Sequence, residues 1–180
     1  MDPFEQADLH QYGMVYMDAE CCGDSHRDNI LDPLHTDVSI GTAYDDYTFM
    51  IVQNFENNYI KLDKPLAKRA NYVELVGDFP SGQIHAINVH YDVKPTPEIY
   101  DQNKDGSSYG LGELVSTVVP PGNNSSAAVI VADVWNSGRQ SAEIGFSLNS
   151  INESRGVYTI VVMLEDRDGN VFPAISYSLL

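Results

Sequence analysis

The chain has 180 residues and a formal net charge of −16, from 26 Asp and Glu against 10 Lys and Arg. This excess of acid argues against nucleic-acid binding, which needs clustered Lys and Arg, and against attraction to an anionic membrane surface. No apolar run approaches the roughly 20 residues that span a bilayer, and two cysteines are too few for a disulfide-rich scaffold. The apolar content of 43% is typical of a globular protein.

The acidic residues are distributed unevenly along the chain. Residues 1–60 contain twelve acids and one basic residue, Arg27, whereas residues 61–180 contain fourteen acids and nine bases. This asymmetry predicts two regions with different surfaces, either simply well solvated or suited to high salt or divalent cations. The first six residues lack the basic and apolar segments of a signal peptide, so the protein stays inside the cell or its start lies further upstream.

The first region has the pattern of helices followed by a hairpin. Residues 7–20 predict a helix, and residues 25–31 predict a short helix that a Ser-x-x-Asp capping box opens and Asp-Pro ends. Residues 38–44 and 48–55 predict two strands joined at a pair of aspartates. Cys21 and Cys22 are adjacent and bond to each other only through a strained ring, so we expect two reduced thiols.

From about residue 62 onward the pattern changes to strands. Ile87, Val89 and Tyr91 alternate with polar residues, which predicts a half-buried strand, and residues 157–164 are almost continuously apolar, as in a central strand. Turn signals separate the segments, so we expect a β-sandwich. The predicted strands are 72–76, 84–93, 110–119, 127–135, 144–148, 157–164 and 174–179.

Three segments in a fixed order resemble a known family. They are the run Ser-His-Arg-Asp-Asn-Ile-Leu-Asp-Pro at residues 25–33, Val-x-Ile-Gly at 38–41 and Gln-Asn-Phe at 53–55. Together they resemble the carboxy-terminal part of a CAP (SCP-like) domain, and the β region resembles a domain that follows it in some archaeal proteins. The resemblance implies an α+β fold class: a partial CAP-like α-β segment over 1–61, then an all-β, Ig-like antiparallel sandwich over 62–180.

The resemblance implies that His26 is a ligand-binding residue of the CAP cleft. A whole cleft holds two histidines and two acids, and the segment that supplies the others would lie upstream, which favours a fragment. Asp24 and Asp28 are the acids nearest to His26 in sequence. Because a metal site or general base needs convergent partners, the alternative, which the residues alone favour, is an exposed or capping-region histidine.

A second candidate site lies in the β region. Asp101, Asn103 and Asp105 followed by a glycine match the start of a calcium loop. The glutamate expected at the twelfth position is one residue late, at Glu113, so a polar turn is the alternative. Calcium at this loop, or zinc at His26, is the cofactor that the candidate sites suggest. Three Asn-x-Ser sequons, beginning at residues 123, 124 and 152, fall in predicted turns.

These observations favour a non-catalytic, secreted or cell-surface binding module of the CAP-like type. Its expected partner is a protein, glycan or lipid, with self-association as a further expectation, and with neither nucleic acid nor a transmembrane segment. One alternative is a metal-assisted hydrolase that uses the cleft around His26. Another is a structural surface protein that assembles through sheet edges.

Overall fold

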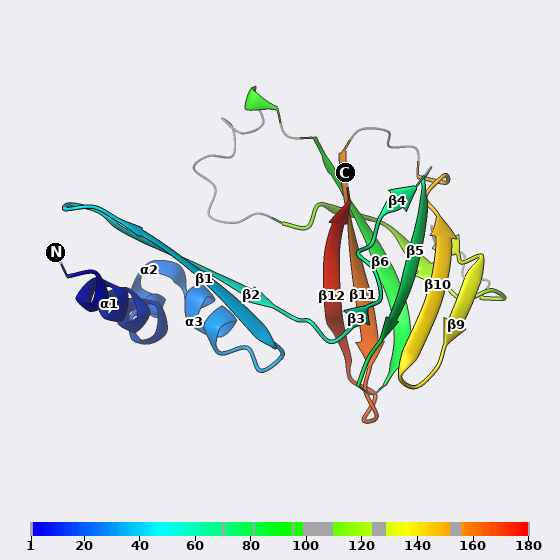
Figure 1. The fold of residues 1–180 in the computed structure, drawn as a ribbon, viewed down its shortest axis with the longest axis horizontal. Helices are drawn as coiled ribbons and strands as arrows, with labels where there is room; N and C mark the ends of the chain where they lie inside the picture. The colour runs from blue at the N-terminus through cyan, green and yellow to red at the C-terminus, as the bar shows by residue number, and fades with distance from the viewer. Residues whose placement is uncertain are drawn as a thin grey trace. The chain divides into compact units, whose positions relative to one another are not determined.

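The computed structural model describes residues 2–69, 71–80, 82–94, 96–98, 110–123, 129–151 and 156–179. The chain forms two compact units, Met1–Asn58 and Tyr59–Leu180 (Figure 1). The sequence predicts this boundary between residues 61 and 62. Each unit is described by itself below.

Unit 1 contains three short helices and one hairpin. Asp2 opens the first helix, because its carboxylate accepts the Phe4 backbone N–H at 2.9 Å and a proline occupies the first helical position. Asp45 shapes the hairpin turn by accepting the backbone N–H groups of Tyr47 and Thr48 at 2.8 and 2.7 Å. The elements are α1 (Pro3–Tyr16), α2 (Asp18–Cys22), α3 (Ser25–Ile30), β1 (Asp37–Tyr44) and β2 (Phe49–Glu56).

One face of strand β2 lies against the helices, whereas β1 is exposed along its whole length. Gln53 donates a side-chain hydrogen bond to Gln11 of α1 at 2.7 Å, and the ring of Phe49 lies 5.5 Å from that of His10. No apolar side chain of unit 1 is fully buried among the residues that the structure describes. Unit 1 therefore lacks the closed hydrophobic core that normally stabilises a domain.

Unit 2 consists of two five-stranded sheets with the arrangement of a β-sandwich (Figure 1). One sheet has the order β3-β5-β10-β9, with β4 also paired to β5, and the other has the order β12-β11-β6-β7-β8. The strands are β3 (Lys61–Leu62), β4 (Lys68–Arg69), β5 (Tyr72–Asp78), β6 (Gln83–Val93), β7 (Glu113–Val119), β8 (Val129–Val131), β9 (Val134–Ser137), β10 (Ser141–Ser147), β11 (Gly156–Glu165) and β12 (Val171–Leu179).

Apolar side chains from both sheets form one core. Ile87 and Val89 of β6 are fully buried and Tyr91 is 9% exposed, which confirms the alternation predicted for that strand. Strand β11 lies between β12 and β6, and five consecutive residues in it are buried, as its continuous apolar sequence predicted. The other sheet contributes the fully buried Ile144 and Phe146 of β10.

The predicted α+β fold class is wrong. Half of the chain is in strands and 17% in helices, so the protein is mainly β. The three helices are short and confined to unit 1, where they share the unit with a hairpin of sixteen strand residues, eight in each strand. The helical signal at the start of the chain was real, but the strands dominate because they account for nearly all of the regular structure in the longer unit.

The predicted purely antiparallel, Ig-like sandwich needs a second correction. Strands β7 and β8 pair in parallel, and the single strand predicted over 127–135 is two strands in different sheets. The chain crosses between the sheets at Ala132 and Asp133: the Ala132 N–H bonds to Val119 O at 3.0 Å, and the Asp133 N–H bonds to Gly145 O at 2.8 Å. A continuous apolar pattern does not reveal such a crossing, because both strands face the same core.

Replacing the core residue Phe146 is expected to destabilise unit 2. Phe146→Ala leaves a cavity at a fully buried position, so we expect a loss of about 3–5 kcal/mol in its free energy of unfolding. Chemical denaturation followed by fluorescence measures this loss, because the only tryptophan, Trp135, packs against the unit 2 core. Phe4→Ala is the matched control, since Phe4 is 81% exposed in unit 1. Equal midpoints for the two variants would contradict the core described here.

Candidate functional site

A carboxylate on α2 positions the side chain of His26. Asp18 Oδ1 lies 2.7 Å from His26 Nδ1, and the Asp18 side chain is 1% exposed whereas that of His26 is 51% exposed. The buried carboxylate therefore holds the imidazole ring, and with it the other ring nitrogen Nε2, in one orientation. This is the arrangement that general bases and metal-binding histidines use.

Asp18 also caps helix α3. Its Oδ2 accepts the backbone N–H groups of His26 at 2.7 Å and Arg27 at 3.2 Å. The predicted Ser25 capping box is therefore wrong: Asp24 is the N-cap residue, its side chain makes no capping hydrogen bond, and a carboxylate from the preceding helix accepts the free amides instead. Asp24 and Asp28, the acids expected near His26, are not its partners in the structure; Asp24 lies 3.7 Å from Arg27.

The environment of Asp18 favours its charged form. Burial acts to raise the pKa of the carboxyl, but the hydrogen bond from the His26 side chain and those from the backbone N–H groups of Arg27 and His26 outweigh it and lower the pKa below its usual value. Asp18 is thus a carboxylate at neutral pH whose oxygens accept the backbone N–H groups of His26 and Arg27 and contact the His26 ring.

The two cysteines lie beside this pair. Cys21 and Cys22 are at disulfide distance, so the expectation of two reduced thiols is not met. Their sulfur atoms and a carboxylate oxygen of Asp18 all lie within 4.8 Å of one another, which makes these three residues a possible metal-binding cluster. Cys21 is exposed and Cys22 is half-buried.

The other histidines lie elsewhere. His35 stacks on Phe55 with the ring centres 5.2 Å apart, and its two ring nitrogens face the side-chain oxygens of Asn57 and Asn29 at 2.8 and 3.3 Å. His10 stacks on the hairpin. In unit 2, His85 pairs with Glu165 at 3.1 Å and His90 faces the Gly112 carbonyl.

The predicted calcium residues Asp101, Asn103 and Asp105 lie outside the residues that the structure describes. The same holds for the sequons that begin at residues 124 and 152. Asn123 is in a described turn, where its backbone N–H bonds to Pro120 O at 3.3 Å. The calcium site therefore stays a prediction.

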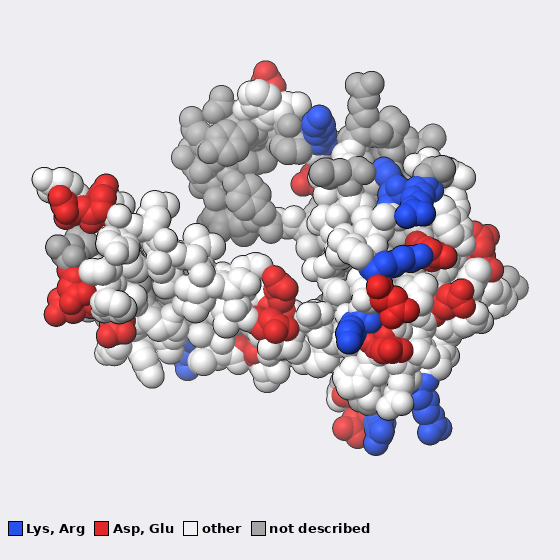
Figure 2. Space-filling model, viewed as in Figure 1, with Lys and Arg blue, Asp and Glu red and all other residues white. Residues whose placement is uncertain are grey.

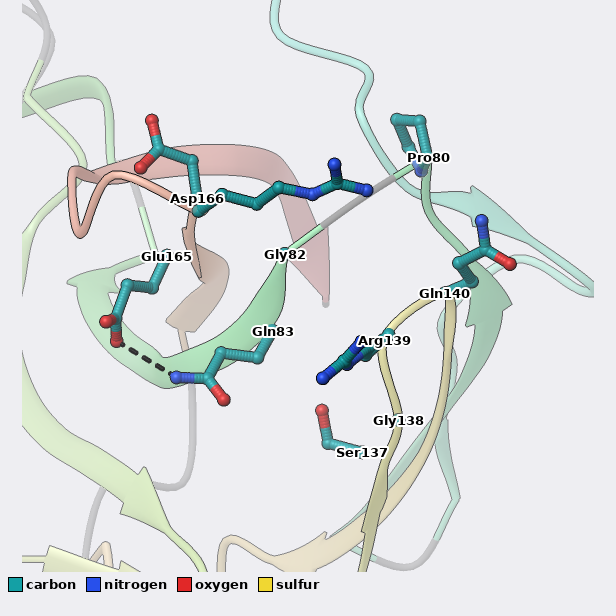
Figure 3. A pocket seen from close by; sticks show the side chains of 10 residues that line it. Pro80, Gly82, Gln83, Ser137, Gly138, Arg139, Gln140, Glu165 and Asp166 are labelled. Atoms are coloured by element: carbon teal, nitrogen blue, oxygen red, sulfur yellow. Dashed lines mark hydrogen bonds between the residues drawn. The ribbon is translucent and has the colours of Figure 1, made fainter.

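A cleft of about 750 Å³ opens at one end of unit 2. Three connections form it: the segment between β5 and β6, which joins the two sheets, and the turns β9–β10 and β11–β12. Figure 3 shows the side chains of Gln83, Ser137 and Arg139 directed into the same space. The lining residues are Pro80, Gly82, Gln83, Ser137, Gly138, Arg139, Gln140, Glu165, Asp166 and Arg167.

Backbone hydrogen bonds hold the walls of this cleft in place. The Phe79 N–H bonds to Gln140 O at 2.9 Å, and the Ile84 N–H bonds to the Ser137 hydroxyl oxygen at 3.4 Å. The second bond joins the start of β6 in one sheet to the end of β9 in the other. The connections that form the cleft are therefore bonded to each other and to the ends of strands β6 and β9.

The acidic side chains of the cleft have hydrogen-bond partners, whereas its arginines form no ion pair with a described residue. Hydrogen bonds from His85 and Gln83 lower the pKa of Glu165, and those from the Asn170 side chain and backbone lower that of Asp166. Both carboxylates are thus ionised and already bonded. The guanidinium groups of Arg139 and Arg167 have no acidic partner within ion-pair distance in the described part of the chain.

The two arginines lie in a strongly acidic protein. Figure 2 shows Asp and Glu gathered on unit 1, whereas Lys and Arg are interleaved with acids on the visible face of unit 2. Sequence reasoning did not single out Arg139 or Arg167, because each lies in an ordinary turn. It also missed Asp18, which lies within a predicted helix with no spacing that links it to His26.

Comparisons with protein-family models, with curated proteins and with solved structures found no match. No helix in the described part of the chain is both long and apolar enough to cross a membrane.

Removing the charge of Asp18 is expected to destabilise unit 1. Because its pKa is lowered in the folded protein, the carboxylate stabilises the fold above its unfolded pKa, and that stabilisation is lost as the pH falls through the folded pKa. Asp18→Asn should therefore melt at a lower temperature near neutral pH and should lose less stability than the wild type on acidification. Far-ultraviolet circular dichroism follows this, since α1, α2 and α3 lie in unit 1.

The matched control is Asp28→Asn, which changes an exposed carboxylate within α3, the helix that Asp18 caps from α2. It should melt like the wild type. If the two variants behave alike, Asp18 does not have the structural role assigned to it.

Proposed function

We propose that this protein is a non-catalytic binding module whose β-sandwich takes an acidic carbohydrate in the cleft of unit 2. The supporting observation is the pair of guanidinium groups, on Arg139 and Arg167, that line this cleft and form no ion pair with any acidic residue that the structure describes. An anionic group on a ligand completes their pairing with charge-assisted hydrogen bonds. Two arginines and two carboxylates line the cleft, so an anionic ligand is repelled less here than on the strongly acidic remainder of the chain.

The polar groups around the arginines suit a sugar ring. Gln83, Gln140 and Ser137 provide amide and hydroxyl groups that both donate and accept hydrogen bonds, as sugar hydroxyls do. Glu165 and Asp166 at the margin are ionised acceptors for further hydroxyls. The volume of about 750 Å³ lies in the range of small-molecule sites. Because the cleft is open, it admits an oligosaccharide chain and does not need to enclose a single sugar.

The remaining parts of the proposal come from the resemblance. Unit 1 is the partial CAP-like segment, and the protein is secreted or displayed at the cell surface. A calcium ion at Asp101, Asn103 and Asp105, or a zinc ion in unit 1, is an accessory part of the same module. Calcium bound by these oxygen donors stabilises the segment that holds them.

Binding should depend on both arginines of the cleft. Arg139→Gln and Arg167→Gln each remove a charged fork of donors while keeping a polar side chain, so we expect each to weaken binding about tenfold or more. Calorimetric titration of the full chain with uronic-acid oligosaccharides, beside neutral oligosaccharides of the same length, measures the effect. The neutral sugars should bind much more weakly than the acidic ones.

Arg69→Gln is the control, because Arg69 lies on β4 and outside the cleft. It should bind like the wild type. Binding of neutral and acidic sugars with equal affinity, or binding that is insensitive to the cleft arginines, would refute the proposed ligand.

The contact between Asp18 and His26 supports a second candidate, a hydrolase that uses His26 as a general base. A histidine held by a buried carboxylate at 2.7 Å has the orienting partner that proton transfer requires. The two candidates predict different outcomes with a chromogenic ester. A hydrolase cleaves it and loses the activity in His26→Ala, whereas the binding module shows no turnover in either protein.

A further inference from the structure

The adjacent cysteines at the end of α2 lie next to a fixed carboxylate oxygen. Cys21 Sγ is 3.8 Å from Asp18 Oδ1, and both sulfur atoms belong to the cluster in which all ligand atoms lie within 4.8 Å. Ligand atoms around a tetrahedral ion lie about 3–4 Å apart. The two sulfur atoms are bonded to each other in this structure, so they reach that separation only after the disulfide is reduced.

The two oxygens of Asp18 have different surroundings. Oδ2 accepts the amides of His26 and Arg27 at the start of α3, which fixes the carboxylate in place. Oδ1 faces the Cys21 sulfur and the Nδ1 of His26 at 2.7 Å. Carboxylates that bind metal ions are themselves hydrogen-bonded, and His26 supplies such a contact to Asp18.

The redox state of the cysteines determines whether this cluster can bind a metal. In the disulfide, each sulfur is bonded to the other and is a poor ligand. Reduction by a dithiol transfers two electrons and two protons: the S–S bond breaks, two thiols form, and the dithiol becomes a cyclic disulfide. Binding of a divalent ion then releases the two thiol protons, which leaves two thiolates and one carboxylate as ligands.

The surroundings favour both steps. Cys21 is exposed, so a reductant reaches the disulfide from solvent. Residues 1–58 contain twelve acids and one basic residue, which gives unit 1 a net charge of 1 − 12 = −11 and attracts a cation. Two sulfur donors select a thiophilic ion such as zinc over calcium or magnesium.

We propose that Cys21 and Cys22 form a redox-controlled metal site: as a disulfide they bind no ion, and after reduction by a dithiol they bind one zinc ion together with Asp18. Three protein ligands leave one tetrahedral position for water or an outside ligand. This inference does not depend on the carbohydrate cleft, which lies in the other unit.

Metal titration of the full chain in both redox states tests the proposal. The protein is reduced with a dithiol, freed of reductant under nitrogen and titrated with zinc alone, beside an untreated sample. We expect one zinc ion per reduced chain and no zinc bound at this site in the oxidised sample. Cadmium, titrated in the same way, should give the ultraviolet charge-transfer absorption of thiolate ligands in the reduced sample only.

Each of the variants Cys21→Ser and Cys22→Ser should roughly halve this absorption and weaken zinc binding about tenfold or more, and the double variant should abolish the absorption. Asp24→Asn, which changes an acid near the site but outside the cluster, should leave both unchanged. Equal zinc binding in the two redox states, no binding in either, or binding that His26→Ala removes and the serine variants keep would each overturn the proposal. Acidic-sugar binding is measured on the same samples, so a failure of either proposal is seen separately.

Discussion

A buried carboxylate organises the amino-terminal unit. Asp18 is the only fully buried residue among those described in residues 2–58, in a unit where apolar side chains such as Leu9, Ile40 and Tyr44 are more than half exposed. A buried charge is costly unless it is bonded, and Asp18 is bonded through both oxygens. The same contacts start helix α3, orient His26 and place an oxygen beside the cysteines. The candidate chemistry of unit 1 therefore depends on this one side chain.

The carboxy-terminal unit is organised in the opposite way. There the two sheets close over an apolar core in which residues such as Ile87, Ile144 and Ile160 have no solvent exposure. Burial of this kind is the main favourable term in folding, and it leaves the strand ends free to hold polar groups. Arg139 and Arg167 lie on two turns that such strands hold in place. The cleft is thus built on a stable framework, whereas the site in unit 1 depends on the polar contacts that stabilise the unit itself.

The sequence predicted the strands well and the sites poorly, for a physical reason. Alternation in 84–93 and the apolar run in 157–164 are repeated local signals, and the structure confirms both. The crossing at Ala132 and Asp133 gives no such signal, because both strands face one core. Contacts such as Asp18 with His26 join residues eight positions apart in different helices, and no spacing rule links them. His26 itself was singled out by resemblance, and the site that surrounds it became visible only in the folded chain.

The two proposed sites also differ in how they respond to salt. Arg139 and Arg167 are exposed, so dissolved ions compete with an anionic ligand and screen its attraction at distances beyond about 8–10 Å. The Asp18 carboxylate is buried, and its contacts with His26 and the helix amides are screened much less. The net charge of −11 on unit 1 favours cations mainly at low ionic strength, but the sulfur ligands bind through covalent character that salt does not screen. Carbohydrate binding should thus be more sensitive to salt than zinc binding, because the arginines of the cleft are exposed whereas the Asp18 carboxylate is buried.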